Sequence, residues 1–241
     1  MDYTETSDDP AVVGLARRIF AELLGTGLLV AIVVGSGIAA QRLSPDDVGL
    51  QLLQNSTATV LGLGVLILVL APVSGAHFNP VVTVADWWLG RGAAGFSARH
   101  VGPYVVAQVV GGCLGAVLAN AMFEVPQGTA TTERATAAHL LAEVVATAGL
   151  VLVIFALVRS GRSALAAPAV AAYIGAAYWF TSSTSFANPA VTVGRTFSDT
   201  FAGIEPTSVG PFVLAQLVGG VVGVLLVLAL YPQPHPGASR D

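Results

Sequence analysis

Apolar residues fall into long runs along this chain, and short polar segments separate the runs. A helix that crosses a bilayer needs about 20 mostly apolar residues. Six runs are long enough to cross: 14–38, 50–72, 101–123, 138–159, 165–183 and 209–231. The pattern therefore predicts an all-helical membrane protein with six transmembrane helices.

Two further stretches are apolar but too short and too interrupted to cross the membrane. They are "SGAHFNPVVTVADWWLG" (74–90) and "STSFANPAVTVGRTFSD" (183–199). Irregular backbone survives at membrane depth only where it is buried in protein or lines a water-filled cavity. We therefore expect each stretch to be a loop that enters the membrane, followed by a half-helix that leaves by the same side.

The chain contains an internal repeat, in which each half holds three of the six runs. Matching segments occur in the same order in both halves: "AELLGTGLLV" (21–30) with "AEVVATAGLV" (142–151), "NPVVTV" (79–84) with "NPAVTV" (188–193), and "AQVVGGCLG" (107–115) with "AQLVGGVVG" (215–223). An odd number of spans gives the halves, about 14–123 and 138–231, opposite orientations in the membrane. In proteins with inverted repeats the functional site lies near the bilayer midplane, between the halves.

Each half ends with a pair of glycines at four-residue spacing, Gly111 with Gly115 and Gly219 with Gly223. Small residues at this spacing let membrane helices approach closely. We expect these glycines to hold the two halves together and not to contact a solute.

Each re-entrant stretch carries an Asn-Pro dipeptide. We expect Asn79 and Asn188 to cap the half-helices, with Pro80 and Pro189 at the first helical positions, where a missing N–H costs nothing. The opposite orientation of the halves then points both helix N-termini at one central point. Two positive helix ends and two asparagine amides repel cations and offer donors to a neutral hydroxylated solute.

The composition fits a membrane protein, because 54% of the residues are hydrophobic and only 10% are charged. A soluble domain carries about 25% charged residues. All ten cations are arginines, and seven lie on one side of the predicted topology: Arg17, Arg18, Arg91, Arg99, Arg159, Arg162 and Arg240. The other three are Arg42, Arg134 and Arg195. By the positive-inside rule, we expect a multi-pass protein of the plasma (inner) membrane with both termini cytoplasmic, and we treat 1–241 as one channel domain with polar tails at 1–13 and 232–241.

The motifs "SGAHFNPVVT" and "NPAVT", the glutamates of the first and fourth runs, and the doubled six-span layout resemble the aquaporin and aquaglyceroporin (major intrinsic protein) family. The resemblance covers essentially the whole chain. It implies a bundle of six transmembrane helices plus two re-entrant half-helices, assembled in the bilayer as a homotetramer with one pore per protomer. The implied pore centre is Asn79, Pro80, Val81, Asn188, Pro189 and Ala190, and it departs from the family at Val81, where alanine is usual.

Three ionisable residues near the predicted pore need a role. Glu22 and Glu143 are lone acids in apolar spans, which marks them as functional by default. One possible role is a proton relay. The family resemblance implies another role, in which both glutamates accept hydrogen bonds from the re-entrant backbone. We favour the second role, because unwound backbone in the membrane needs partners. His77 resembles the family's loop histidine near the cytoplasmic mouth; among pore-lining, pH-sensing and structural roles we favour a structural role with pore contact.

The selectivity filter departs from the family pattern. Most members have an arginine directly after the second Asn-Pro-Ala, where this chain has Val191. Spacing from the motifs places the other filter positions at Thr59, Ala176 and Ser185, with Gly175 as an alternative to Ala176 and a neighbour of Thr59 as an alternative to Thr59. This set has no aromatic and no charge, so it predicts a wide filter that passes solutes bulkier than water.

A finer resemblance concerns the solute. "NPAV" together with "GRTFSDTFAGI" (194–204) looks like the bacterial aquaporins associated with arsenic resistance. The resemblance implies that the chain conducts water, glycerol- or urea-like solutes and neutral trivalent arsenic hydroxides.

Arg195 lies seven residues beyond Asn188, and Asp86 lies seven beyond Asn79. On an ideal helix each returns to nearly the same face, about 10 Å farther along the axis. Arg195 is then either a displaced substitute for the missing filter arginine or a snorkelling residue at the membrane surface. We favour the surface position, because a half-helix ends near the surface there.

Three classes of protein share such a repeat: a passive channel, an ion-coupled secondary transporter and a membrane scaffold with a vestigial pore. A coupling carboxylate at the midplane is expected of the transporter and bulky filter residues of the scaffold, and the sequence favours the channel on both points. The sequence has no zinc-protease, nucleophile-elbow or phosphate-loop motif. We therefore expect no enzyme activity, no cofactor or metal, and no nucleic-acid partner.

Overall fold

A computed structural model describes residues 13–90 and 96–231 of the chain. Arg91 and Arg240, which entered the orientation argument, lie outside the described residues. The predicted tails at 1–13 and 232–241 also lie outside them, apart from Val13.

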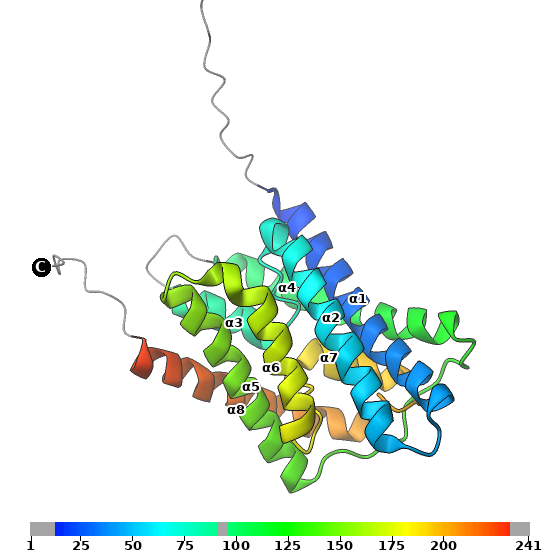
Figure 1. Ribbon diagram of the computed structural model, residues 1–241. Coiled ribbons are helices and arrows are strands. Elements are labelled where there is room, and N and C mark those ends of the chain that lie inside the picture. The colour runs from blue at the N-terminus through cyan, green and yellow to red at the C-terminus, as the bar shows by residue number, and fades with distance from the viewer. Residues whose placement is uncertain (1–12, 91–95, 232–241) are drawn as a thin grey trace, which may run out of the picture.

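The described residues contain six helices that are long and apolar enough to cross a membrane, which confirms the predicted count. They are α1 (Leu15–Leu43), α2 (Val48–Ser74), α4 (Ala98–Met122), α5 (Ala137–Arg159), α6 (Ala166–Phe180) with the short η1 (Ser163–Leu165) before it, and α8 (Pro206–Leu230). Figure 1 shows these helices packed side by side in one bundle. The described part of the chain forms no strand.

Two short helices complete the bundle. They are α3 (Pro80–Leu89) and α7 (Pro189–Gly194), and η2 (Arg195–Phe197) continues directly from α7. Each short helix contacts α4 of the first half and α8 of the second half, and the two short helices also contact each other (Figure 1). Both re-entrant segments therefore lie inside the bundle, where the sequence predicted them.

The predicted glycine pairs are in close contacts, but within each half. A Cβ on Gly111 would lie 2.3 Å from the Leu23 carbonyl oxygen, so α4 packs tightly on α1. A Cβ on Gly219 would lie 2.6 Å from the Val144 carbonyl oxygen, so α8 packs equally tightly on α5. The prediction that these glycines join the two halves is wrong, because the face that carries them points to the first helix of the same half.

In each half, the glycine directly after the first member of the pair makes the contact between the two halves. A Cβ on Gly112 of α4 would lie 2.7 Å from the carbonyl oxygen of Ala190 in α7. A Cβ on Gly220 of α8 would lie 2.5 Å from a side-chain carbon of Val81 in α3. Glycine at these two positions is what lets each half-helix approach the last span of the other half.

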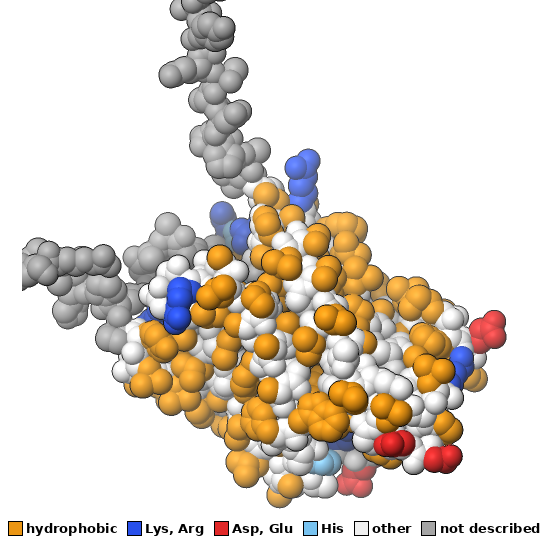
Figure 2. Space-filling view, viewed as in Figure 1, with side chains coloured by type: hydrophobic (Ala, Val, Ile, Leu, Met, Phe, Trp, Pro, Cys, Tyr) orange, Lys and Arg blue, Asp and Glu red, His pale blue; other side chains and the backbone are white. Residues whose placement is uncertain are grey.

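The outer surface of the bundle is apolar. Large side chains point outward from the long helices, among them Leu61, Leu68, Val106, Leu141 and Leu225, each more than half exposed. Figure 2 shows hydrophobic side chains covering most of the visible face, with charged side chains toward its margins. This distribution fits a protein surrounded by lipid.

Candidate functional site

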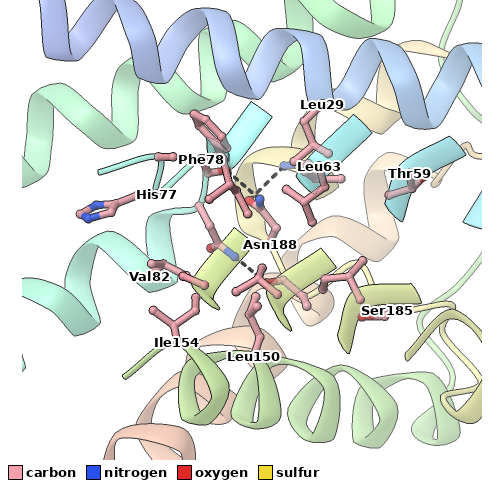
Figure 3. A pocket seen from close by; sticks show the side chains of 18 of the residues that line it. Leu29, Thr59, Leu63, His77, Phe78, Val82, Leu150, Ile154, Ser185 and Asn188 are labelled. Carbon is pink, nitrogen blue, oxygen red and sulfur yellow. Dashed lines mark hydrogen bonds between the residues drawn. The ribbon is translucent and has the colours of Figure 1, made fainter. Parts of the chain in front are cut away.

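A cavity of about 260 Å³ lies where the two re-entrant segments meet. Its walls come from both re-entrant loops and half-helices and from α1, α2, α5 and α6. Figure 3 shows Asn188 near the middle of this cavity, with apolar side chains such as Leu29, Leu63, Leu150 and Ile154 around it. The cavity is therefore mostly apolar, with a polar point at its centre.

The polar point is a pair of asparagines bound to each other's loops. The Asn79 amide nitrogen donates to the Ala187 carbonyl at 2.8 Å, and the Asn188 amide nitrogen donates to the Phe78 carbonyl at 2.7 Å. Both asparagines are buried and line the cavity. Because an amide NH₂ carries two donors, each asparagine keeps one N–H beyond this bond.

The asparagine oxygens hold the half-helices. The side-chain oxygen of Asn79 accepts from the backbone N–H of Val81 at 2.9 Å, and that of Asn188 accepts from Ala190 at 2.9 Å and Val191 at 3.3 Å. A proline occupies the first helical position in both cases. The N-termini of α3 and α7 therefore face each other across the cavity, as the Asn-Pro spacing led us to expect.

The loops before the asparagines contain strained backbone. Five non-glycine residues adopt the left-handed conformation, with φ from 47° to 60°: Ala76, Phe78, Thr184, Ser185 and Ala187. Such conformations are uncommon outside glycine and persist only where the surroundings over-determine them. Each loop therefore needs strong partners.

Glu22 supplies those partners for the first loop. One carboxylate oxygen accepts from the Ser74 hydroxyl at 2.7 Å and the His77 backbone N–H at 3.0 Å. The other accepts from the Phe78 backbone N–H and the Gln108 amide nitrogen, both at 2.7 Å. Glu22 is fully buried, and four donors use its carboxylate.

Glu143 does the same for the second loop. One oxygen accepts from the Ser183 hydroxyl at 2.6 Å and the Phe186 backbone N–H at 2.9 Å. The other accepts from the Ala187 backbone N–H at 2.8 Å and the Gln216 amide nitrogen at 2.7 Å. The structure thus contains the backbone hydrogen bonds that the family resemblance implied for both glutamates.

Two glutamines in these networks were missed in the sequence. Gln108 also donates to the Thr83 hydroxyl at 2.9 Å, and Gln216 to the Thr192 hydroxyl at 2.8 Å. The sequence does contain a pattern that could have identified these glutamines, because both lie in the repeated "AQxVGG" segments. A buried polar residue that recurs in both halves of an apolar repeat needs an internal partner.

His77 lines the cavity and is also held in place. One ring nitrogen lies 3.2 Å from the Thr83 hydroxyl, and the other lies 3.3 Å from a carboxylate oxygen of Asp86. Its ring packs against those of Phe96 and Tyr104, at centroid distances of 5.1 Å and 5.6 Å. The structure therefore combines pore contact with a fixed orientation at this residue.

The predicted filter positions divide into three that line the cavity and one that does not. Thr59, Ser185 and Val191 line it, whereas Ala176 is exposed on the surface of α6. The prediction for Ala176 is wrong, because the face of α6 that carries this residue points away from the cavity. Three buried residues of α6 line the cavity instead, Val170, Ile174 and Tyr178, and the Tyr178 hydroxyl lies 3.1 Å from that of Thr59. Gly175, the alternative, packs against Val60.

Arg195 is not at the membrane surface, so that prediction is also wrong. It is 3% exposed and lines the cavity. Its Nε donates to the Ala202 carbonyl, and its guanidinium lies over the Phe186 ring at 3.5 Å from the centroid. The physical reason is that the chain after η2 folds back over the end of the half-helix and keeps Arg195 inside. The cavity lining therefore includes aromatic rings as well as a cation, whereas the expected filter had neither.

A second arginine that the sequence analysis did not single out packs on the same ring. The Arg134 guanidinium lies 5.3 Å from the Phe186 centroid and donates to the carbonyls of Gly203 at 2.7 Å and Phe201 at 3.0 Å. Burial lowers the pKa of the Arg134 guanidinium from its ordinary value, and the negative charge of Glu143 opposes that shift. Arg134 does not line the cavity.

This fold and this cavity define a membrane channel in which two asparagine-capped half-helices meet between repeat-related halves. The family model "Major intrinsic protein" matches residues 11–185. The chain belongs to this family, which consists of channels and not enzymes; the family resemblance and the expectation of no enzyme activity are confirmed.

Individual relatives agree with the family. The chain is 47% identical over 223 residues to Aquaglyceroporin AqpS of Rhizobium meliloti, across 92% of this chain and 93% of that protein. It is 39% identical over 111 residues to the glycerol uptake facilitator protein of Escherichia coli, across 45% of this chain and 36% of that protein. The crystal structure of the aquaglyceroporin from Plasmodium falciparum has the same fold, with a TM-score of 0.68 at 20% identity, over 90% of this chain and 97% of that chain.

Proposed function

We propose that this chain is a passive channel for water and small neutral solutes, namely glycerol- and urea-like molecules and the neutral trivalent arsenic hydroxides. The observation that carries the proposal is the paired asparagines, each with an N–H beyond its structural bond, at the centre of a mostly apolar cavity. A polyol has a hydroxyl edge and a hydrocarbon edge. The asparagine N–H groups can bind the hydroxyl edge, and the apolar side chains of the cavity can contact the hydrocarbon edge.

The proposed filter is revised to Thr59, Tyr178, Ser185 and Val191. Tyr178 takes the place of Ala176 and brings an aromatic ring to the lining. Val191 still leaves the family's arginine position without a long side chain. This absence supports passage of solutes larger than water.

An ion-coupled transporter remains the competing hypothesis. Among the described residues that line the cavity, Asp86 is the one carboxylate, and it stands seven residues along α3 from Asn79. The carboxylates of Glu22 and Glu143 already accept four hydrogen bonds each. No group at the centre is therefore available to bind and release a coupling proton.

Stopped-flow light scattering on proteoliposomes tests the proposal. We expect water, glycerol, urea and arsenite to cross faster than in empty liposomes, each down its own gradient and regardless of an imposed pH step. Accumulation of glycerol or arsenite against its gradient, driven by protons, would refute a passive channel. Transport of water alone would refute the proposed solutes.

We further propose that the whole chain acts as one channel domain, forms a homotetramer and has both termini in the cytoplasm. Contacts between helix ends support the topology behind this orientation, because Arg18 donates to Tyr104 near the start of α4 and Arg159 to the Tyr231 carbonyl after α8. Native mass spectrometry tests the tetramer. Labelling of a single cysteine added at each terminus, in sealed and in permeabilised cells, tests the orientation.

A further inference from the structure

Arg195 is a buried cation that the proposed function does not use. It forms no ion pair with a carboxylate of the described residues. Its Nε is bonded to Ala202 and its plane is fixed on Phe186. Neither terminal nitrogen makes a hydrogen bond within the described part of the chain, and the residue lines the cavity. Its terminal N–H groups are therefore available to a solute in the cavity.

A buried arginine is normally paired, since an isolated charge costs free energy in a low-dielectric interior. Here the face of an aromatic ring takes the place of an anion. Arg134 packs on the same ring but does not line the cavity, and the Glu143 carboxylate accepts from the Phe186 backbone N–H at 2.9 Å. Of the two cations, Arg195 is therefore the one that lines the cavity, where its charge disfavours a passing cation.

The position of Arg195 relative to Val191 matters for selectivity. The Arg195 backbone N–H donates to the Val191 carbonyl, so Arg195 lies one helical turn beyond Val191. One turn corresponds to about 5.4 Å along the axis. The charge is therefore displaced outward from the family's arginine position, and the proposed filter with Val191 carries no charge.

Ser185 provides a second, independent observation. Its hydroxyl is buried, lines the same cavity and has no hydrogen-bond partner within the described residues. A buried polar atom without a partner is rare in proteins and calls for an explanation. A solute hydroxyl in the cavity would satisfy it.

We propose that Arg195 is a specificity-determining residue of this channel. Its terminal N–H groups and the Ser185 hydroxyl form the polar edge of the cavity mouth beyond Val191, where they bind neutral solutes that present two acceptor oxygens on one edge, and the guanidinium charge excludes cations. The inference rests on the proposed function, whose polyols and neutral arsenic hydroxides belong to this class. The planar guanidinium suits paired acceptors, because its donors are fixed in one plane.

The charge is tested with Arg195→Gln, using Arg134→Gln as the matched control. Both arginines pack on Phe186 and bond to the 201–203 segment, but only Arg195 lines the cavity. In proteoliposomes with a pH-sensitive dye and a potassium gradient, we expect cation leak to rise about tenfold in Arg195→Gln, a factor equivalent to about 1.4 kcal/mol. Arg134→Gln and Arg195→Lys should leak no more than the wild type.

Equal leak in Arg195→Gln and Arg134→Gln, or wild-type leak in both, would overturn the inference and reduce Arg195 to a structural residue. Glycerol flux of the wild type is measured in the same vesicles. If the wild type conducts no glycerol, the proposed function fails; if it conducts glycerol and Arg195→Gln does not leak, only this inference fails.

The polar edge is tested with Ser185→Ala, which is expected to fold because the hydroxyl has no protein partner to lose. We expect the ratio of glycerol to 1-propanol permeability to fall about threefold, because only glycerol has neighbouring hydroxyls for the mouth to bind. The matched control is Ser160→Ala, at the end of α5 and outside the cavity lining. An unchanged ratio in Ser185→Ala would refute the polar edge, even if Arg195→Gln fails to fold.

Discussion

Replacing Glu143 by glutamine tests how the second re-entrant loop is held. The carboxylate accepts four hydrogen bonds, two on each oxygen. A glutamine keeps one oxygen and places an NH₂ group where the other oxygen stood. In one orientation the NH₂ faces the backbone N–H of Phe186, and in the other it faces that of Ala187.

The magnitude follows from which donors can adapt. The Ser183 hydroxyl can rotate and accept, and Gln216 can flip, since its oxygen has no partner within the described residues. A backbone N–H can do neither, so Glu143→Gln leaves one buried donor unpaired, at a cost of about 1–3 kcal/mol. Glu143→Leu leaves both backbone donors unpaired, at a cost of about 2–6 kcal/mol by the same reasoning.

The assay is thermal unfolding of the purified channel in detergent, followed by size-exclusion chromatography, with glycerol flux measured well below the transition. We expect stability to fall in the order wild type, Glu143→Gln, Glu143→Leu, and Glu22→Gln to match Glu143→Gln because the two networks correspond. Glu205→Gln, at the half-buried N-cap of α8 and outside both networks, is the control. A Glu143→Gln variant as stable as the wild type would refute the reasoning; one that is stable and has lost a pH dependence of the wild type would point to a proton relay.

Three further predictions concern the cavity and its walls. Val191→Arg should lower the ratio of glycerol to water permeability about tenfold, equivalent to about 1.4 kcal/mol, because it adds a second cation one turn below Arg195; an unchanged ratio would mean that position 191 does not set selectivity. Asn188→Asp should raise cation leak with the fold retained, because it places a carboxylate at a positive helix end; a folded variant with wild-type leak would contradict a pore-centre role. Gly112→Val should lower the free energy of unfolding by about 1–3 kcal/mol, because its Cβ would meet the Ala190 carbonyl, and a wild-type melting temperature would contradict the close approach.

The sequence predicted the long helices and the half-helices because both leave strong local signals. A run of about 20 apolar residues has few alternatives to a membrane helix. Asn79-Pro80 and Asn188-Pro189 carry a cap and a first-turn residue in adjacent positions, and the repeat doubled that signal. Hydrogen bonding at the half-helix N-termini was therefore predictable to the residue.

The filter was less predictable because it depends on helix register and on a return of the chain. Ala176 and Tyr178 are two residues apart in a helix that is apolar on every face, so no pattern distinguishes the lining face from the lipid face. Arg195 follows a half-helix that was expected to end near the surface, and only the packing of Ala202 and Phe186 around it keeps it buried. Both contacts are made by residues outside the Asn-Pro motif, so the motif gives no information about them.

The reciprocal bonds between the asparagines and the opposite loops constrain the order in which the molecule forms during synthesis. Asn79 is bonded to a carbonyl 108 residues later in the chain, and Phe78 to an amide 110 residues later. A nascent chain that has delivered only α1 to α4 into the membrane therefore carries an unpaired amide and an unpaired carbonyl at the tip of its first loop. The amide and the carbonyl remain unpaired until the second loop enters from the other side. The centre of the pore is therefore among the last parts of the protein to form.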